Sequence, residues 1–346
     1  MKLDTPATNW CDDEITAIGD ELLDDEMEGP INEDFAPWMD TVSDSSDTDD
    51  DPKGRPVGEP AKWPQTTVSS TEMDRLSVLV LDDWDPFRFK HEEPSSQCQR
   101  RLEDDLLDLF NDPLTGVYIE PVAVGRFHVV MVVPSHTPCE GGFFHFLIQC
   151  PKDCPMRPPR VRLMNTDDGS VSFNPNLYKS GRVCLDILES SDTSASSPAL
   201  TIASVVVSIQ SLLTEKALFN DPHWCSEERT EDCDSYTCVV QHETIRVAVC
   251  DAIDACLNGS SLCPGYLQRV MLEHFIAYYE KYEKVVESNL DLTGAFMRDP
   301  LSFETYERGQ YQYDILLVKL RKMKPEVENL IKALDEGEQG VAVPIL

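Results

Sequence analysis

The amino-acid sequence predicts an α+β fold, in which one amphipathic helix, a four-stranded antiparallel sheet and a second apolar helix form a common core. Three observations lead to this prediction: helical spacing of apolar residues at 97–110, four runs typical of strands between residues 117 and 164, and a capped apolar helix that begins after Thr201. Turns rather than helices separate the four runs. Strands connected in this way pair antiparallel, because a parallel pair needs a long crossover connection.

The first predicted helix spans residues 97–110. Its acidic side chains lie off the apolar stripe, and Asn111 and Pro113 end the pattern. This separation of apolar and charged residues is typical of a helix with one face on a core. The apolar stripe consists of Cys98, Leu102, Leu106, Leu109 and Phe110.

The strand-like runs cover residues 117–122, 126–133, 142–149 and 160–164. Alternate residues of a strand point to the same face of a sheet. In the second run, one such set of alternating residues is apolar, and we expect it in the core. It consists of Phe127, Val129, Met131 and Val133.

Helical patterns dominate the second half of the chain. Thr201 is placed to cap a helix, and apolar residues from Ile202 to Leu213 recur at steps of three and four. The aromatic stripe around Phe275 and Tyr282 is interpreted as part of a core. Further helical stretches are expected at residues 239–256, 266–287 and 313–334.

The chain is strongly acidic, since its 346 residues carry a formal net charge of −34. Residues 1–60 alone hold 19 acidic and 3 basic side chains, so we expect residues 1–93 to be a disordered tail. This tail is either a solubilising segment or a regulatory arm whose serines, Ser43 and Ser45 among them, suit kinases. The charge argues against nucleic acid and membrane partners, because both would repel the chain.

Cysteine usage points to a reducing compartment. The chain has 12 cysteines, but its first residues form no apolar signal segment, so we expect reduced thiols in the cytoplasm and also in the nucleus. No apolar run approaches the roughly 20 residues of a membrane span. The cysteines at 225–263 form no CxxC pair, so structural thiols are favoured over a metal site. We expect no cofactor.

The chemistry is expected in the run at 173–188, which reads FNPNLYKSGRVCLDIL. It holds one cysteine, Cys184, after an asparagine turn and a glycine turn. A cysteine on an exposed, rigid mount, with a donor for the developing oxyanion, is sufficient for acyl transfer. A thiol with a pKa of about 8.5 is already a few per cent thiolate at neutral pH, so thioester exchange needs no dedicated base.

The motifs, taken in their order, resemble the catalytic domain of ubiquitin-conjugating enzymes. After the helix and the strands come PMRPPRV at 155–161, FNPN at 173–176, VCLDIL at 183–188 and SPALTI at 197–202. The resemblance covers residues 94–254 and implies the α+β fold of that family. It is strongest with a subclass that has a helical C-terminal extension, expected here at residues 255–335, before a flexible tail at 336–346. Asn174, where most of the family has histidine, and the long loop from Cys184 to Pro198 mark this subclass.

The resemblance implies catalytic roles position by position. Cys184 matches the cysteine that takes ubiquitin, or a ubiquitin-like modifier, as a thioester and passes it to a lysine or to a ligase cysteine. The alternative for Cys184 is an ordinary buried thiol. Asn176 matches an asparagine that either donates to the oxyanion or orders the loop that presents the cysteine, and both roles stay open. Asp221 matches an acid that orients the incoming lysine, although an Asp-Pro turn explains it equally well, and Asp186 is a second candidate.

The same resemblance implies the partners: ubiquitin or a ubiquitin-like modifier, an activating enzyme, and ligases of the RING or the cysteine type. Met156, Pro198 and Ala199 match ligase-contact positions on two loops, and a flexible methionine suits a shallow partner surface. Arg100 and Arg101 match the basic cluster that faces the activating enzyme, although acidic residues follow them here. The subclass implies charging by the second, less common ubiquitin-activating enzyme.

Two other functions remain open from the sequence. A noncatalytic variant of the fold would bind ubiquitin and a partner without chemistry, and a scaffold would act through the acidic tail and the helical extension. Noncatalytic variants usually lack the cysteine. Cys184, in an intact Val-Cys-Leu context, therefore favours the active enzyme.

Overall fold

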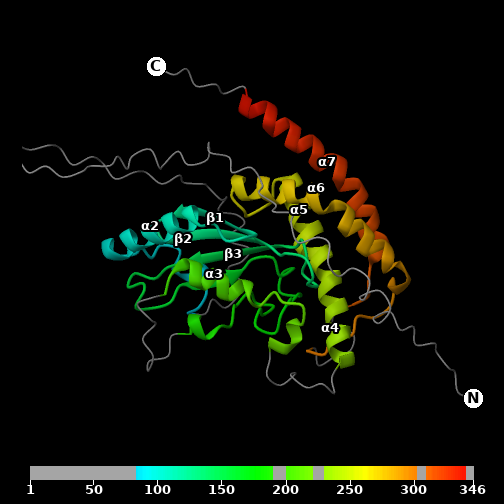
Figure 1. The fold of residues 1–346 in the computed structure, drawn as a ribbon, viewed down its shortest axis with the longest axis horizontal. Helices are drawn as coiled ribbons and strands as arrows, with labels where there is room; N and C mark the ends of the chain where they lie inside the picture. Colours follow the sequence, from blue (N-terminus) through cyan, green and yellow to red (C-terminus); the bar gives the residue numbers. More distant parts are fainter. Residues whose placement is uncertain (1–82, 190–199, 221–229, 302–308, 340–346) are drawn as a thin grey trace, which may run out of the picture. The chain divides into compact units, whose positions relative to one another are not determined.

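The computed structural model describes residues 83–189, 200–220, 230–301 and 309–339, and the statements below concern these ranges. They lie within one compact unit, Trp63–Leu346. In this part of the chain, helices combine with an antiparallel sheet, which confirms the predicted α+β class (Figure 1).

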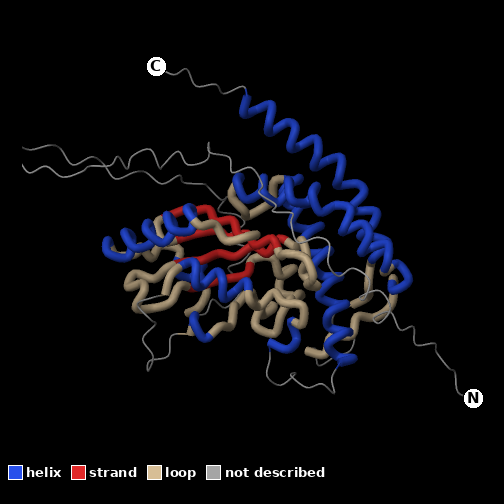
Figure 2. The backbone as a smooth tube through the Cα atoms, in the orientation of Figure 1, coloured by secondary structure: helices blue, strands red, loops and turns tan. Residues whose placement is uncertain are grey.

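The sheet has four strands in the order β1-β2-β3-β4, and every neighbouring pair is antiparallel. Figure 2 shows the strands side by side in red. The predicted meander is confirmed, because local alternation and local turns determine where each strand begins and ends. The strands are β1 (Val117–Ala123), β2 (Arg126–Val132), β3 (Phe143–Gln149) and β4 (Arg160–Leu163).

The inner face of the sheet packs against α2 (Ser96–Asn111) and α3 (Ile202–Gln210). Thr201 caps α3 through the amide of Ser204, as predicted. Ser95 caps α2 through the amide of Cys98. One residue of the predicted apolar stripe differs: Phe110 is 48% exposed, because α2 runs past the edge of the core there. The strand and helix residues of this inner core include Cys98, Leu102, Leu106, Phe127, Val129, Met131, Phe144, Phe146, Val205 and Ile209.

A second core lies on the outer face of the sheet, where Val130, Val132 and Phe143 contact the C-terminal helices. The hydroxyl of Tyr282 donates to the carbonyl of Gly141 at 2.6 Å and fixes one of these helices to the β2–β3 turn. Both faces of the sheet are therefore covered, and every residue of β3 is buried. The helices are α4 (Thr230–Glu243), the π-helix η7 (Thr244–Asp251), α5 (Ala252–Asn258), α6 (Gly265–Ser288) and α7 (Tyr313–Gln339).

The segment that precedes α2 also covers the outer face. It contains the short 3-10 helix η2 (Pro86–Phe89). Asp85 forms a buried ion pair with Arg162, and the Arg160 guanidinium lies 3.6 Å from the centroid of the Phe89 ring. The sequence predicts residues 83–93 as part of the acidic tail, because charged residues are frequent there. In the structure these residues are ordered, since their aromatic and acidic side chains contact arginines of β4.

Short 3-10 helices complete the described structure: η3 (Asp186–Leu188), η4 (Ala217–Asn220) and η8 (Leu290–Leu292). The aromatic stripe of α6 is buried, as predicted, through Phe275 and Tyr282. Among the described helices, none combines the length and the apolar character that crossing a membrane demands.

Candidate active site

The run at 173–188 folds back on itself as a narrow hairpin beside β4. Leu177 pairs with Val183, and Arg182 pairs with Arg162 of β4. The turn of the hairpin depends on Gly181, whose φ of +88° is in the left-handed region. A Cβ atom at this glycine would lie 2.6 Å from the carbonyl oxygen of Leu163, so this position has no room for a side chain. The backbone of the hairpin therefore lies directly against β4, and its side chains Leu177 and Val183 join the inner core.

Cys184 lies at the end of this hairpin and is partly exposed. Its amide N–H donates to the carbonyl of Asn176 at 2.8 Å. The chain then turns into η3, so the sulfur is held between two short pieces of ordered backbone. This arrangement contradicts the alternative that Cys184 is an ordinary buried thiol.

Asn174 orders the turn that precedes the cysteine. It is fully buried, and its side-chain nitrogen donates to the carbonyl of Leu212 at 2.8 Å. Its side-chain oxygen accepts from the amide of Asn176 at 2.8 Å. The residue that distinguishes this chain from most of the resembled family thus ties the asparagine turn to the segment after α3.

The side chain of Asn176 makes no hydrogen bond among the described residues, and Asn176 is partly exposed. Of the two roles left open for it, loop ordering is already performed by Asn174. A free amide at this position is suited to donate to an oxyanion that forms only during reaction.

Two residues that the sequence did not indicate contact the sulfur of Cys184. The Tyr178 side chain lies close enough to Cys184 to interact with it, and this interaction and, to a smaller extent, partial burial raise the pKa of Tyr178. The carboxylate of Glu189 lies 3.9 Å from the sulfur and 3.8 Å from Arg182. Both contacts depend on the hairpin shape, and neither residue forms part of a chemical motif on its own.

Asp221, Pro198 and Ala199 are outside the described residues. Asp186 is exposed at the first position of η3. Met156 is 55% exposed in the turn before β4, which leaves its side chain accessible for a partner.

The two arginines proposed to face an activating enzyme differ in their surroundings. Arg100 is exposed on α2. Arg101 is half-buried and donates to the carbonyl of Leu200 at 3.1 Å. Asp105, one turn later, accepts from the amide of Ile202 at 3.0 Å. Arg101 and Asp105 therefore hold the start of α3 against α2.

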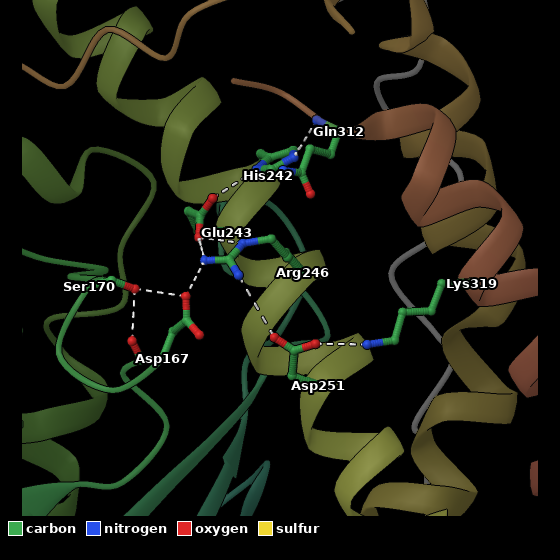
Figure 3. A network of polar contacts seen from close by, with 8 residues as sticks. All are labelled: Asp167, Ser170, His242, Glu243, Arg246, Asp251, Gln312 and Lys319. Carbon is green, nitrogen blue, oxygen red and sulfur yellow. Dashed lines mark hydrogen bonds and ion pairs between the residues drawn. The ribbon is translucent and has the colours of Figure 1, made fainter. Parts of the chain in front are cut away.

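A polar network links the loop before the hairpin to the C-terminal helices, as Figure 3 shows. Arg246 of the π-helix lies 2.7 Å from Asp167 and 2.6 Å from Glu243. Burial raises the pKa of Glu243, but hydrogen bonds from His242 and Arg246 outweigh it and lower the pKa. The amide of Gln312 donates to His242 Nε2 at 3.0 Å. The Nδ1 atom of His242 is then the donor to Glu243, which fixes the tautomer.

The described residues contain no group of three or more His, Cys, Asp and Glu side chains arranged to hold a metal ion.

Comparison with known proteins places this geometry in a family. The family model described as ubiquitin-conjugating enzyme matches residues 101–232. The chain is 40% identical over 254 residues to ubiquitin-conjugating enzyme E2 Z of Danio rerio, an alignment that covers 72% of this chain and 75% of that protein. It is 39% identical over 255 residues to ubiquitin-conjugating enzyme E2 Z of Homo sapiens, covering 72% of this chain and 70% of that protein.

Another relative matches a shorter stretch of this chain. Ubiquitin-conjugating enzyme E2 2 of Candida albicans is 35% identical over 144 residues, which cover 41% of this chain and 72% of that protein. Enzymes of this kind are transferases that work through a thioester, together with ubiquitin, an activating enzyme and ligases. The chain belongs to the ubiquitin-conjugating enzyme family.

Proposed function

We propose that Cys184 is the residue that accepts ubiquitin, or a ubiquitin-like modifier, as a thioester and passes it to a substrate lysine or to a ligase cysteine. The observation that carries this proposal is the mount of Cys184: its sulfur is partly exposed, and its amide is bonded to the carbonyl of Asn176. A nucleophile held in this way meets an incoming thioester without reorganising the loop.

In the loading step, the Cys184 thiolate attacks the carbonyl carbon of the thioester on the activating enzyme. The tetrahedral intermediate collapses, the new carbon–sulfur bond remains on Cys184, and the thiolate of the activating enzyme leaves. The Tyr178 hydroxyl, whose side chain interacts with Cys184, is placed to donate to the attacking sulfur and to stabilise its negative charge before attack.

In the discharge step, a neutral lysine amine attacks the thioester carbonyl and the Cys184 thiolate leaves. The Asn176 side chain is the donor that we assign to the oxyanion, because it has no other hydrogen bond in the described part of the chain. Glu189, 3.9 Å from the sulfur, is a carboxylate that attracts the lysine ammonium before it loses its proton. Asp221 remains a candidate for the same task.

The partner contacts follow the resemblance. Met156, Pro198 and Ala199 are proposed to contact ligases of the RING or cysteine type, and Met156 offers a half-exposed apolar side chain for this. Arg100 and Arg101 are proposed to face the activating enzyme, which we infer to be the second, less common type. Residues 94–254 form the proposed catalytic domain and 255–335 its helical extension. The many free thiols favour the reducing cytoplasm or nucleus.

A non-reducing gel tests the proposal. The full chain is mixed with ubiquitin, ATP and each type of activating enzyme. A thiol-sensitive adduct is expected with the natural chain and not with Cys184→Ala, and Cys184→Ser should give an adduct that resists thiols, because an oxyester replaces the thioester. If no activating enzyme gives an adduct, the proposal is wrong, and a noncatalytic variant of the fold or a scaffold is favoured instead.

A further inference from the structure

Three cysteines from separate parts of the chain meet beside α2, outside the hairpin. Cys98 lies on α2, Cys150 follows β3, and Cys154 lies in the turn that leads to β4. Cys150 and Cys154 line one cavity, and the Cys98 thiol lies close enough to Cys154 to interact with it. Cys98 and Cys150 are buried, Cys154 is half-exposed, and all three are free thiols. The arrangement joins one accessible thiol to two enclosed ones.

Within this thiol cluster (Cys98, Cys150 and Cys154), the accessible thiol is the one whose pKa is lowered. The interactions with Cys150 and Cys98 lower the pKa of Cys154 and outweigh its burial. The interaction with Cys154 and, to a smaller extent, burial raise the pKa of Cys98 and of Cys150. Arg101 favours the thiolate of Cys154, whereas Asp153 opposes it. A half-exposed thiolate is the form of cysteine that oxidants attack.

A small cavity adjoins the cluster. Its volume is about 10 Å³, and its walls include Cys150, Cys154, Asp105 and Arg157. This is room for about one water molecule, so hydrogen peroxide, which has two oxygen atoms, reaches Cys154 from its exposed side rather than from within the cavity. Large electrophiles have to approach Cys154 from its exposed side.

We propose that Cys154 is a peroxide-reactive thiol, and that Cys98 or Cys150 resolves its oxidised form into a disulfide. The Cys154 sulfur attacks one oxygen of hydrogen peroxide, the O–O bond breaks, and the released hydroxide takes up a proton as water. Cys154 is thereby oxidised to a sulfenic acid. A neighbouring thiol then attacks that sulfur, the S–S bond forms, and the sulfenic oxygen leaves as a second water.

The position of the cluster gives the modification a consequence that rests on the proposed function. Cys154 precedes Met156 by two positions in the same turn. The adjoining cavity is also lined by Leu200 and Ile202, at the start of α3. A disulfide here changes the packing beneath the surface assigned to ligases. The chemical proposal itself does not depend on that assignment.

Peptide mapping of the full chain tests the chemistry without any activity measurement. The chain, as the natural protein and as Cys184→Ser, is treated with equimolar hydrogen peroxide, alkylated and digested with trypsin. Cleavage after Lys90, Arg100, Arg126, Lys152 and Arg160 puts Cys98, Cys150 and Cys154 in three different peptides. We expect a peptide cross-linked through Cys154 to Cys98 or to Cys150, about 2 Da lighter than the two reduced peptides together.

Cys238 provides the control, because it is an exposed cysteine outside the cluster. If the thiolate character of Cys154 governs reactivity, Cys154 is oxidised before Cys238, although Cys238 is more accessible. Alkylation of Cys154 should then change less than twofold between pH 8 and pH 6. An ordinary thiol with a pKa of about 8.5 slows roughly 80-fold over the same interval.

Variants separate the attacked thiol from the resolving ones. In Cys154→Ser the cross-link is expected to vanish, and in the double variant Cys98→Ser with Cys150→Ser a sulfenic acid on Cys154 should accumulate and react with dimedone. Cys238→Ser should behave as the natural chain does. The proposal is overturned if Cys238 is oxidised first, if Cys154 stays fully alkylatable after peroxide, or if its disulfide partner is another cysteine. The natural chain alone decides these points, even where a variant folds poorly.

Discussion

The side-chain oxygen of Asn174 accepts a hydrogen bond from the amide of Asn176 at 2.8 Å. Through its nitrogen, the same side chain holds the carbonyl of Leu212. One buried amide thus satisfies groups of the asparagine turn and of the segment after α3. Asn174 therefore orders the turn, and the side-chain amide of Asn176 remains available to donate a hydrogen bond during the reaction.

Replacing Asn176 by alanine is expected to slow discharge to lysine about 100-fold to 1,000-fold, the usual effect of losing one oxyanion donor. Loading from the activating enzyme should change much less. Single-turnover gels measure both steps, with discharge followed by adding free lysine to the charged enzyme. The thermal midpoint should stay near that of the natural chain, because no described contact of the Asn176 side chain is lost. Equal slowing of both steps would favour the loop-ordering role instead.

Replacing Asn174 by alanine is expected to act on stability. The substitution leaves the backbone amide of Asn176 without its partner and removes one of the two side-chain donors to the carbonyl of Leu212, the other being Asn220. The expected loss is about 1–3 kcal/mol in the free energy of unfolding, the usual cost of unsatisfied buried groups. Urea denaturation measures it. Loading and discharge should fall together, in contrast to Asn176→Ala, and a wild-type unfolding midpoint would contradict the role assigned to Asn174.

The strands and the first helices were predictable because their signals are local. Alternation from Phe127 to Val133 and the cap at Thr201 each depend on a few adjacent residues. The second core was not predictable, since Val130 and Phe143 contact helices more than 100 positions later. Cys184 and Asn176 were found because they share one short run, and the structure leaves their catalytic roles as proposals.

The missed parts of the site all depend on folding. Tyr178 and Glu189 flank Cys184 in sequence, but only the hairpin turns their polar atoms toward its sulfur. Arg246 reaches Asp167 across 79 positions. The aromatic residues of η2 looked like part of a charged tail, because their partners are arginines on a distant strand.

Tyr178→Phe is expected to lower the rate of both loading and discharge by roughly threefold to tenfold, since one hydrogen bond to a developing thiolate is lost at a partly exposed site. The ring itself is retained, so the unfolding free energy should change little. Loading is measured at limiting activating enzyme and discharge with excess lysine. Tyr266→Phe, on the extension, is the matched control and should leave both rates unchanged. Unaltered rates in Tyr178→Phe would remove the hydroxyl from the mechanism.

Arg246→Met is expected to destabilise the chain by about 3–5 kcal/mol, because Glu243 is only 2% exposed and keeps its charge without its main partner. Adding Glu243→Gln removes that buried charge, so the double variant should recover part of the loss. The comparison uses urea denaturation at neutral pH. Arg321→Met, which breaks exposed pairs to Glu283 and Glu287, should cost less than about 1 kcal/mol. If Arg246→Met also lowers the free energy of unfolding by less than about 1 kcal/mol, the network does not behave as a buried ion-pair system.

The histidine pair on the outer face of the sheet makes stability depend on pH. His128 Nδ1 and His145 Nε2 are 2.7 Å apart and buried. Burial and, to a smaller extent, the positive charge of Arg126 lower the pKa of His128 to about 4. Burial and, to a smaller extent, the electrostatic effect of His128 lower the pKa of His145. Both rings are therefore neutral in the folded chain at pH values where the unfolded chain, with pKa values near 6.5, already binds protons.

The sign follows from this difference in proton binding. Because the unfolded state takes up more protons below pH 6.5, the free energy of unfolding should be highest above that pH and fall as the pH drops toward 4. Each histidine contributes up to about 1.4 kcal/mol per pH unit in this window. Urea denaturation at pH 7, 6 and 5 measures the slope. His128→Gln with His145→Gln should flatten it, whereas His91→Gln, at an exposed position, should not. An unchanged slope in the double variant would assign the acid sensitivity to other groups.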